Sequence, residues 1–373
     1  MEFIDLKSQQ AIIRKKIDNR IKSVLDHGQF IMGPEVFELE ERLADYVGVK
    51  HCISCSSGTD ALLIPLMAKG IGQGDAVLTS PFTYIATAEV IALLGATPIF
   101  IDIYPSTYNI DPSGIDNAIK EAHKKGLIPK AIIPVDLFGL PARYRLIEEK
   151  ANEHGLFLLE DAAQGFGGMI RGKKAGSFGD VASTSFFPAK PLGCYGDGGA
   201  IFTDDKHLAE TIRSIRVHGS GADKYDNIQI GINGRLDTIQ AAILLEKLSI
   251  FDNELISRNN LASYYTDNIS SKIERPITPE GYSSSWAQYS IVLNREVERD
   301  YVIKKMKDIG IPCMVYYKIP LHLQKVYKNL GYQNGDFPIS EKISNKILSL
   351  PMHPYLDKEK QDKILEELKK YEK

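Results

Sequence analysis

An aspartate and a lysine stand where the chain could bring two reactive side chains into one site. Asp161 follows the apolar run 155–159 and a glutamate, which is typical of a buried strand that ends in carboxylates. Lys190 follows an aromatic segment and precedes the glycine-rich residues 193–199. Apolar surroundings lower the pKa of a lysine amine and make a neutral nucleophile available. Such an amine could form a Schiff base with pyridoxal phosphate while Asp161 keeps the pyridine nitrogen protonated, although the residue types equally allow a strand-end acid and an unrelated surface lysine.

A possible phosphate site lies between a predicted strand, residues 51–55, and a predicted helix. Ser56-Ser57-Gly58-Thr59 would place unpaired amides at the helix N-terminus, where the helix dipole favours an anion. Gly58 would allow a close backbone approach, and the hydroxyl groups of Ser57 and Thr59 could donate hydrogen bonds. The same residue types would also be found if they only capped the N-terminus of the helix and bound no ligand. Ser185 could add a further donor, or could be a buried strand serine.

Several other side chains could contact a flat ring or a sugar. Tyr84 follows a predicted strand and could stack on a heteroaromatic ring, or could fill the core. Gln164 could bind a ring hydroxyl, or could point into a loop. His322 belongs to the segment 315–322, whose aromatic and polar residues suit a sugar or nucleotide surface but also a solvated loop. The residue types alone do not decide between these alternatives.

The order of the predicted elements defines the fold class as α/β. Strands alternate with helices over about the first two hundred residues, which predicts a doubly wound, mainly parallel sheet. Ligands bind such sheets at the carboxyl ends of the strands, where the predicted loops carry the candidate residues. A strong apolar helix is expected over 236–251 and a further helix over 338–349. We expect a large domain over residues 1–250, with an N-terminal helical segment, and a smaller α+β domain over residues 251–373.

The composition excludes several classes of protein. A formal net charge of −3 gives no basic footprint for nucleic acid, and no stretch approaches the ~20 apolar residues of a membrane span. The first residues lack a signal peptide, and four cysteines do not make a disulfide scaffold, so we expect a cytoplasmic protein. Cys52 and Cys55 form a CxxC, but no second Cys/His pair accompanies it and a strand would turn the two to opposite faces. We therefore expect no metal site.

Four ordered motifs together resemble the DegT/StrS family of sugar aminotransferases. They are Ser-Gly-Thr-Asp-Ala-Leu at 57–62, Glu-Asp-Ala-Ala-Gln at 160–164, Ser-Phe-Phe-Pro-Ala-Lys-Pro-Leu-Gly at 185–193 and Asn-Gly-Arg-Leu-Asp-Thr-Ile-Gln-Ala-Ala at 233–242. The similarity runs over nearly the whole chain. It implies a fold-type I aminotransferase that uses pyridoxal 5'-phosphate and forms a homodimer with shared active sites.

The resemblance also implies roles for individual residues. Lys190 would be the Schiff-base lysine and Asp161 the partner of the pyridine nitrogen, while the other ring and phosphate contacts would come from Gly58, Thr59, Tyr84, Gln164, Ser185 and, from the other subunit, Asn233. The sugar would contact Arg235, Tyr316, Tyr317 and His322. Many relatives read His-Tyr-Pro where this chain has Tyr316-Tyr317-Lys318, so this segment bears on the choice of substrate.

The implied reaction is transamination of a UDP-linked 2-acetamido keto-hexose with L-glutamate as amino donor. The resemblance favours C3 of a 3-keto-uronate, on the route to amino sugars of O-antigen, with C4 of a 4-keto-6-deoxy sugar as the alternative. A dehydratase of this family would lack the lysine, and a non-catalytic binding protein would not need the whole set of residues. A dehydrogenase would require the G-x-G-x-x-G order, which the glycines at 193–199 do not follow.

Overall fold

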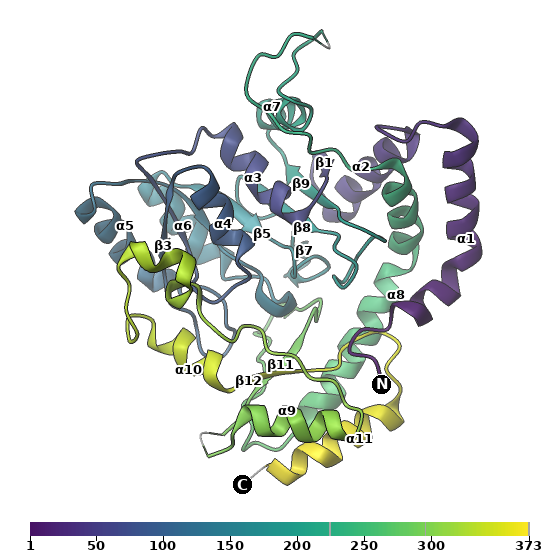
Figure 1. The fold of residues 1–373 in the computed structure, drawn as a ribbon, viewed down its shortest axis with the longest axis vertical. Helices are drawn as coiled ribbons and strands as arrows, with labels where there is room; N and C mark the ends of the chain where they lie inside the picture. Colours follow the sequence, from purple (N-terminus) through teal and green to yellow (C-terminus); the bar gives the residue numbers. More distant parts are fainter. Residues whose placement is uncertain (224, 295, 372–373) are drawn as a thin grey trace.

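The computed structural model, which describes residues 1–223, 225–294 and 296–371, is built on a seven-stranded sheet (Figure 1). In spatial order the strands are β1 (His51–Cys55), β9 (Gly199–Thr203), β8 (Val181–Ser185), β5 (Phe157–Asp161), β4 (Ile128–Ile133), β2 (Asp75–Thr79) and β3 (Thr97–Phe100). Strand β9 is antiparallel to both of its neighbours, and the pairs from β8 to β3 are parallel. The predicted doubly wound, mainly parallel sheet is confirmed.

Helices cover both faces of this sheet because successive strand residues point in opposite directions. One face packs on α3 (Gly58–Ala68), α4 (Ala86–Leu93) and α7 (Lys206–Arg216). The other face packs on α5 (Ile115–Lys124), α6 (Tyr144–His154), α2 (Pro34–Val47) and α8 (Thr238–Asn268). The cysteines of β1 follow this rule, since Cys55 lies in the first core and Cys52 in a core on the other face. The two thiols therefore do not face one another.

The C-terminal part has a hydrophobic core of its own at the lower end of α8 (Figure 1). This core packs β11 (Tyr289–Val292), β12 (Ile347–Leu350), α9 (Arg299–Asp308) and α11 (Lys358–Leu368) around the end of α8. The helix predicted over 338–349 is correct for α10 (Pro338–Lys346) and wrong beyond it, because residues 347–350 pair with β11. The boundary expected after residue 250 falls inside α8, so a continuous helix joins the two parts.

The segment after α9 crosses back to the large sheet. Its apolar residues Leu321, Tyr327 and Phe337 pack on Ala88 and Phe100. It contains η3 (Leu321–Leu323) and η4 (Lys325–Leu330), and it leads into α10 on the left of Figure 1. The division into two domains stays a prediction, since this segment belongs by sequence to the second and packs against the first.

The remaining elements are the N-terminal helix and a set of short strands and 3-10 helices. Helix α1 (Leu6–His27) begins at the cap residue Asp5 and packs on α8. The short elements are β6 (Met169–Ile170), β7 (Lys173–Lys174), β10 (Tyr282–Ser283), η1 (Pro112–Gly114), η2 (Leu137–Gly139) and η5 (Lys369–Tyr371). Within the residues described, no helix is both long and apolar enough to span a bilayer.

Candidate active site

Asp161 is the last residue of β5 and is almost fully buried. Its Oδ2 accepts a hydrogen bond from the Thr87 hydroxyl at 2.9 Å, and its Oδ1 accepts one from the Ala163 amide at 3.1 Å. Burial raises the pKa of this carboxyl, while the two donors and the charge of Lys190 oppose that rise. The fixed carboxylate can therefore serve as a partner for a buried cation.

Lys190 lies beyond the end of β8, the strand that is next to β5 in the sheet. Its backbone amide donates to the Phe187 carbonyl at 2.8 Å, which closes a turn. Burial lowers the pKa of the Lys190 amine, and the nearby charge of Asp161 opposes this effect. The direction is the one expected from the sequence, and the pairing of β5 with β8 brings the ends of both strands together at one edge of the sheet.

Gly58 and Ser185 meet at the N-terminus of α3. A Cβ atom added to Gly58 would lie 2.5 Å from the Ser185 Cβ and 2.8 Å from its Oγ, so only glycine allows this approach. Ser57 caps the helix, because its hydroxyl accepts from the Asp60 amide at 3.0 Å. Within the described chain, the amides of Gly58 and Thr59 donate to no backbone carbonyl, which leaves them available for an anion. Capping and anion binding can therefore coexist here.

A second group of side chains connects Gln164 to the aromatic residues of the site. The Gln164 amide donates to the Tyr317 hydroxyl at 3.3 Å and its Oε1 accepts from the Phe138 amide at 2.9 Å. The Tyr317 ring lies 6.4 Å from the ring of Tyr84, which is 58% exposed. Burial and the charge of Asp161 raise the pKa of Tyr317, so its hydroxyl stays protonated. The structure thus brings the predicted residues 84, 161, 164 and 317 together.

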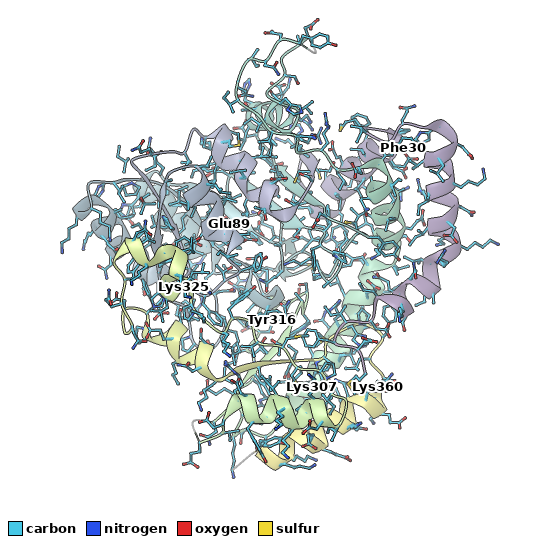
Figure 2. The ribbon with its side chains drawn as sticks, viewed as in Figure 1. Phe30, Glu89, Lys307, Tyr316, Lys325 and Lys360 are labelled. Atoms are coloured by element: carbon cyan, nitrogen blue, oxygen red, sulfur yellow. The ribbon has the colours of Figure 1, made fainter. Side chains whose placement is uncertain are left out.

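Tyr316 lies near the middle of the molecule, between the large sheet and the C-terminal helices (Figure 2). Its ring is 5.8 Å from that of Tyr317 and 6.4 Å from that of Phe3. It is partly exposed. Tyr316 is therefore accessible beside the group formed by Tyr317, Gln164 and Tyr84, as a substrate contact requires.

Asn233 and Arg235 lie next to the start of α3 in the same chain. The Ser56 amide donates to the Gly234 carbonyl at 2.9 Å, and Arg235 donates to the Asn233 Oδ1 at 2.5 Å. Asn233 is exposed, and the buried Nε of Arg235 has no acceptor within the described chain. A single chain does not test the prediction that Asn233 serves the site of a partner subunit.

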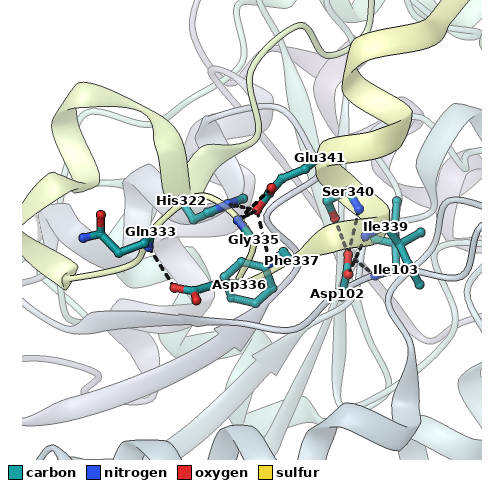
Figure 3. Close-up of polar contacts among 10 residues, drawn as sticks. All are labelled: Asp102, Ile103, His322, Gln333, Gly335, Asp336, Phe337, Ile339, Ser340 and Glu341. Carbon is teal, nitrogen blue, oxygen red and sulfur yellow. Dashed lines mark hydrogen bonds and ion pairs between the residues drawn. The ribbon is translucent and has the colours of Figure 1, made fainter. Parts of the chain in front are cut away.

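His322 lies in a different environment from the other predicted substrate contacts. Its side chain is fully buried, its Nε2 is 2.9 Å from a Glu341 carboxylate oxygen, and its ring packs on Phe337 (Figure 3). Glu341 also accepts from the amides of Gly335 and Phe337. The same figure shows Asp102 capping α10 through Ser340. This arrangement fixes the segment 318–341, and it does not favour the prediction that His322 contacts a substrate.

Two contacts of the site could not be anticipated from the residue types of the candidate site residues. The hydroxyl of Thr87 orients Asp161, and the amide of Phe138 holds Gln164. Thr87 lies in the apolar helix α4. A polar threonine on the side of a helix that is expected to be buried suggests a hydrogen-bonding role, and this is the one indication that the sequence offers. The contact made by the Phe138 amide cannot be predicted from residue type, because every residue except proline supplies a backbone amide.

The residues present fit pyridoxal phosphate. The start of α3 offers unpaired amides and a cradle that a Cβ would fill, which suits the phosphate group. Lys190 offers an amine with a lowered pKa, and Asp161 offers a fixed carboxylate for the ring nitrogen. The exposed ring of Tyr84 offers an aromatic face for the pyridine.

The comparisons with known proteins agree with this fit. The model of the DegT/DnrJ/EryC1/StrS aminotransferase family matches residues 11–369. The chain is 49% identical, over 96% of both chains, to the UDP-2-acetamido-2-deoxy-3-oxo-D-glucuronate aminotransferase of Pseudomonas aeruginosa. A DegT DnrJ EryC1 StrS aminotransferase from Brucella abortus superimposes with a TM-score of 0.96 at 50% identity, covering 100% of this chain and 99% of the other. NtdA from Bacillus subtilis, solved with bound PMP, matches with a TM-score of 0.89 at 32% identity, covering 99% and 83%.

The chain belongs to the DegT/DnrJ/EryC1/StrS aminotransferase family. It is an enzyme with the fold-type I architecture, and its cofactor is pyridoxal phosphate. The reaction class is transamination of a nucleotide-linked sugar.

Proposed function

We propose that this enzyme transfers the amino group of L-glutamate to C3 of UDP-2-acetamido-2-deoxy-3-oxo-glucuronate. The observation that carries the proposal is the pairing of a buried carboxylate, Asp161, with a lysine amine of lowered pKa, Lys190, at the carboxyl end of the sheet. The choice of sugar is supported by the relative that acts on the 3-oxo-glucuronate and shares 49% of its residues with this chain. Amination at C4 has no comparable support among these observations.

When bound, pyridoxal phosphate supplies an electron sink that stabilises a carbanion beside a nitrogen atom. The neutral amine of Lys190 would accept the proton from the α-carbon of glutamate and later deliver a proton to C3 of the sugar. Asp161, oriented by Thr87 and Ala163, would hold the proton of the ring nitrogen. The 2-oxoglutarate formed from glutamate leaves before the keto sugar enters.

Other residues would hold the cofactor and the substrate. We assign the phosphate to Gly58, Thr59 and Ser185, and the ring face to Tyr84. Gln164 would bind the ring hydroxyl. Its contact with Tyr317 extends this network towards Tyr316 and the sugar, and Arg235 is a candidate partner for a uronate carboxylate.

A homodimer completes this proposal. The loop segments 218–223 and 225–232 project from the body of the chain above α7 (Figure 1), and they expose 64% of Ile228 and 84% of Ile230. Apolar side chains so exposed favour contact with another surface. We propose that this loop packs on a second copy and that Asn233 reaches the phosphate of the partner's site. The reduced cysteines favour a cytoplasmic enzyme.

A spectral half-reaction tests the function. The purified protein is converted to its pyridoxamine form with L-glutamate, and UDP-linked 3-keto-uronate or 4-keto-6-deoxy sugars are then added separately. Return of the absorbance of the lysine-bound cofactor with the 3-keto-uronate alone would support the proposal. Return with the 4-keto sugar alone would move the amination to C4, and no change with glutamate would refute the assigned pair of residues.

A further inference from the structure

Two buried carboxyl groups lie directly behind Asp161. Glu160 precedes Asp161 on β5, so its side chain points to the opposite face of the sheet. Asp136 lies three residues beyond the end of β4, the strand next to β5. Both residues are fully buried. Neither group has a role in the proposed reaction, and burying two carboxylates side by side requires a compensating interaction.

Hydrogen bonds account for three of their four oxygen atoms. The two oxygens of Glu160 accept from the amides of Gly176 and Phe178, both at 2.8 Å. The Oδ1 of Asp136 accepts from the Tyr144 hydroxyl at 2.8 Å, and also from a backbone amide. The Oδ2 of Asp136 is buried and has no donor among the described groups unless a carboxyl proton supplies one.

A carboxyl proton could lie between Asp136 and Glu160. The Asp136 and Glu160 carboxyl groups are within hydrogen-bonding reach of each other. Two ionised carboxylates repel one another and cannot form a hydrogen bond, whereas a singly protonated pair can. A proton between the two groups therefore satisfies the remaining oxygen of Asp136 and halves the buried charge.

The pair is connected to the residues assigned to the cofactor. The amide of Asp136 donates to the Asp161 carbonyl at 3.0 Å. The Asp136 carboxyl packs against Gly165, where an added Cβ would lie 2.4 Å from Oδ2. Gly165 belongs to the turn that carries Gln164 and supplies the Ala163 amide to Asp161. Moving the Asp136 carboxyl would therefore move the supports of both ring contacts.

We propose that Asp136 and Glu160 share one proton and that this pair is a positioning device for Asp161 and Gln164. The inference rests on the ring contacts assigned under the proposed function. Loss of the shared proton would place a second negative charge behind Asp161 and push the two carboxyl groups apart. Burial and mutual repulsion raise the pKa of Glu160, which keeps the proton in place at neutral pH. The other titratable groups that face the pair are Tyr144, Asp161 and Tyr282.

Infrared spectroscopy of the protein without cofactor tests the shared proton. A protonated carboxyl absorbs at higher frequency than an ionised one, and its band shifts in D2O. We expect such a band in the wild-type protein at neutral pH, and we expect Glu160→Gln to remove it. The control Glu149→Gln changes an exposed carboxyl on α6 and should leave the band unchanged. A wild-type spectrum without the band would overturn the shared proton.

Affinity for pyridoxal phosphate, measured by equilibrium dialysis, tests the positioning role. Glu160→Ala leaves Asp136 without its partner and should weaken binding at pH 7 by roughly tenfold. Asp136→Asn keeps the acceptor for Tyr144 and places an amide donor at the position of Oδ2, so it should bind nearly as tightly as the wild type and lack the weakening expected of the wild type at alkaline pH. Equal affinity of wild type and Glu160→Ala, or an Asp136→Asn protein that binds as weakly as Glu160→Ala, would overturn the role. If the wild type binds no cofactor, the proposed function and the positioning role both fail, while the infrared band still decides the proton.

Discussion

Gly58→Ala provides a steric test of the phosphate cradle. The added Cβ would lie 2.5 Å from the Ser185 Cβ, whereas ordinary contacts begin at 3.4 Å, so the two segments must separate by 3.4 − 2.5 = 0.9 Å. A hydrogen bond of about 2.8 Å to a phosphate oxygen does not survive a stretch of that size. Loss of one charge-assisted hydrogen bond costs about 1.5–3 kcal/mol, which corresponds to a roughly 10- to 150-fold weaker affinity for pyridoxal phosphate.

The assay is titration of the protein without cofactor by pyridoxal phosphate, followed through the absorbance of the bound form. Gly72→Ala is the matched control, because its added Cβ meets its nearest atom at 3.7 Å. Ser185→Gly removes the atoms at 2.5 and 2.8 Å, so the double variant Gly58→Ala/Ser185→Gly should bind no worse than Ser185→Gly alone. Wild-type affinity of a folded Gly58→Ala protein, or additive losses in the double variant, would refute the reasoning.

Three further predictions follow from the site. Lys190→Ala should keep the fold, as judged by circular dichroism, and reduce turnover by more than roughly 10⁴-fold, because the proton-transferring amine is lost; near-normal turnover would contradict its role. Tyr317→Phe removes the 3.3 Å contact with Gln164 and should reduce kcat/KM by about two- to tenfold, with Tyr301→Phe, an exposed tyrosine on α9, as control in the same steady-state assay. Burial raises the pKa of the coupled Asp136–Glu160 pair, so the native state retains one proton that the unfolded chain releases near pH 4. The free energy of unfolding from urea titrations should therefore fall as the pH rises above about 4, by up to about 1.4 kcal/mol per pH unit, and a Glu160→Gln protein that keeps this slope would rule out the pair as its source.

Local sequence patterns were sufficient for most of the fold. The strand expected over residues 51–55 and the strand expected to end at Asp161 are found as β1 and β5. Residues 347–349 were misassigned to a helix because they continue an apolar pattern that a helix and a strand both satisfy. Their antiparallel pairing with β11, almost sixty residues earlier, decides in favour of the strand.

Some of the candidate site residues are likewise identified by their local sequence, and others are not. Asp161, Lys190 and Gly58 have local contexts that limit their chemistry: Asp161 ends a strand, Lys190 precedes a glycine-rich segment, and Gly58 begins a helix. His322 has no such context, and its burial against Glu341 follows only from the packing of 318–341 on the large sheet. The polar segment around it reads as an accessible surface because burial is not encoded within a few residues.

The sequence by itself determined the α/β class and the order of the strands and helices, and it supplied the candidate residues for binding an aldehyde cofactor. These properties depend on hydrophobic periodicity and on helix starts, which act over a few residues. Only the tertiary structure decided that Thr87 orients Asp161, that Tyr317 meets Gln164 and that Asp136 lies beside Glu160. These partners are 24 to 153 residues apart in the chain, and the packing of the β-sheet and its loops brings them within hydrogen-bonding distance.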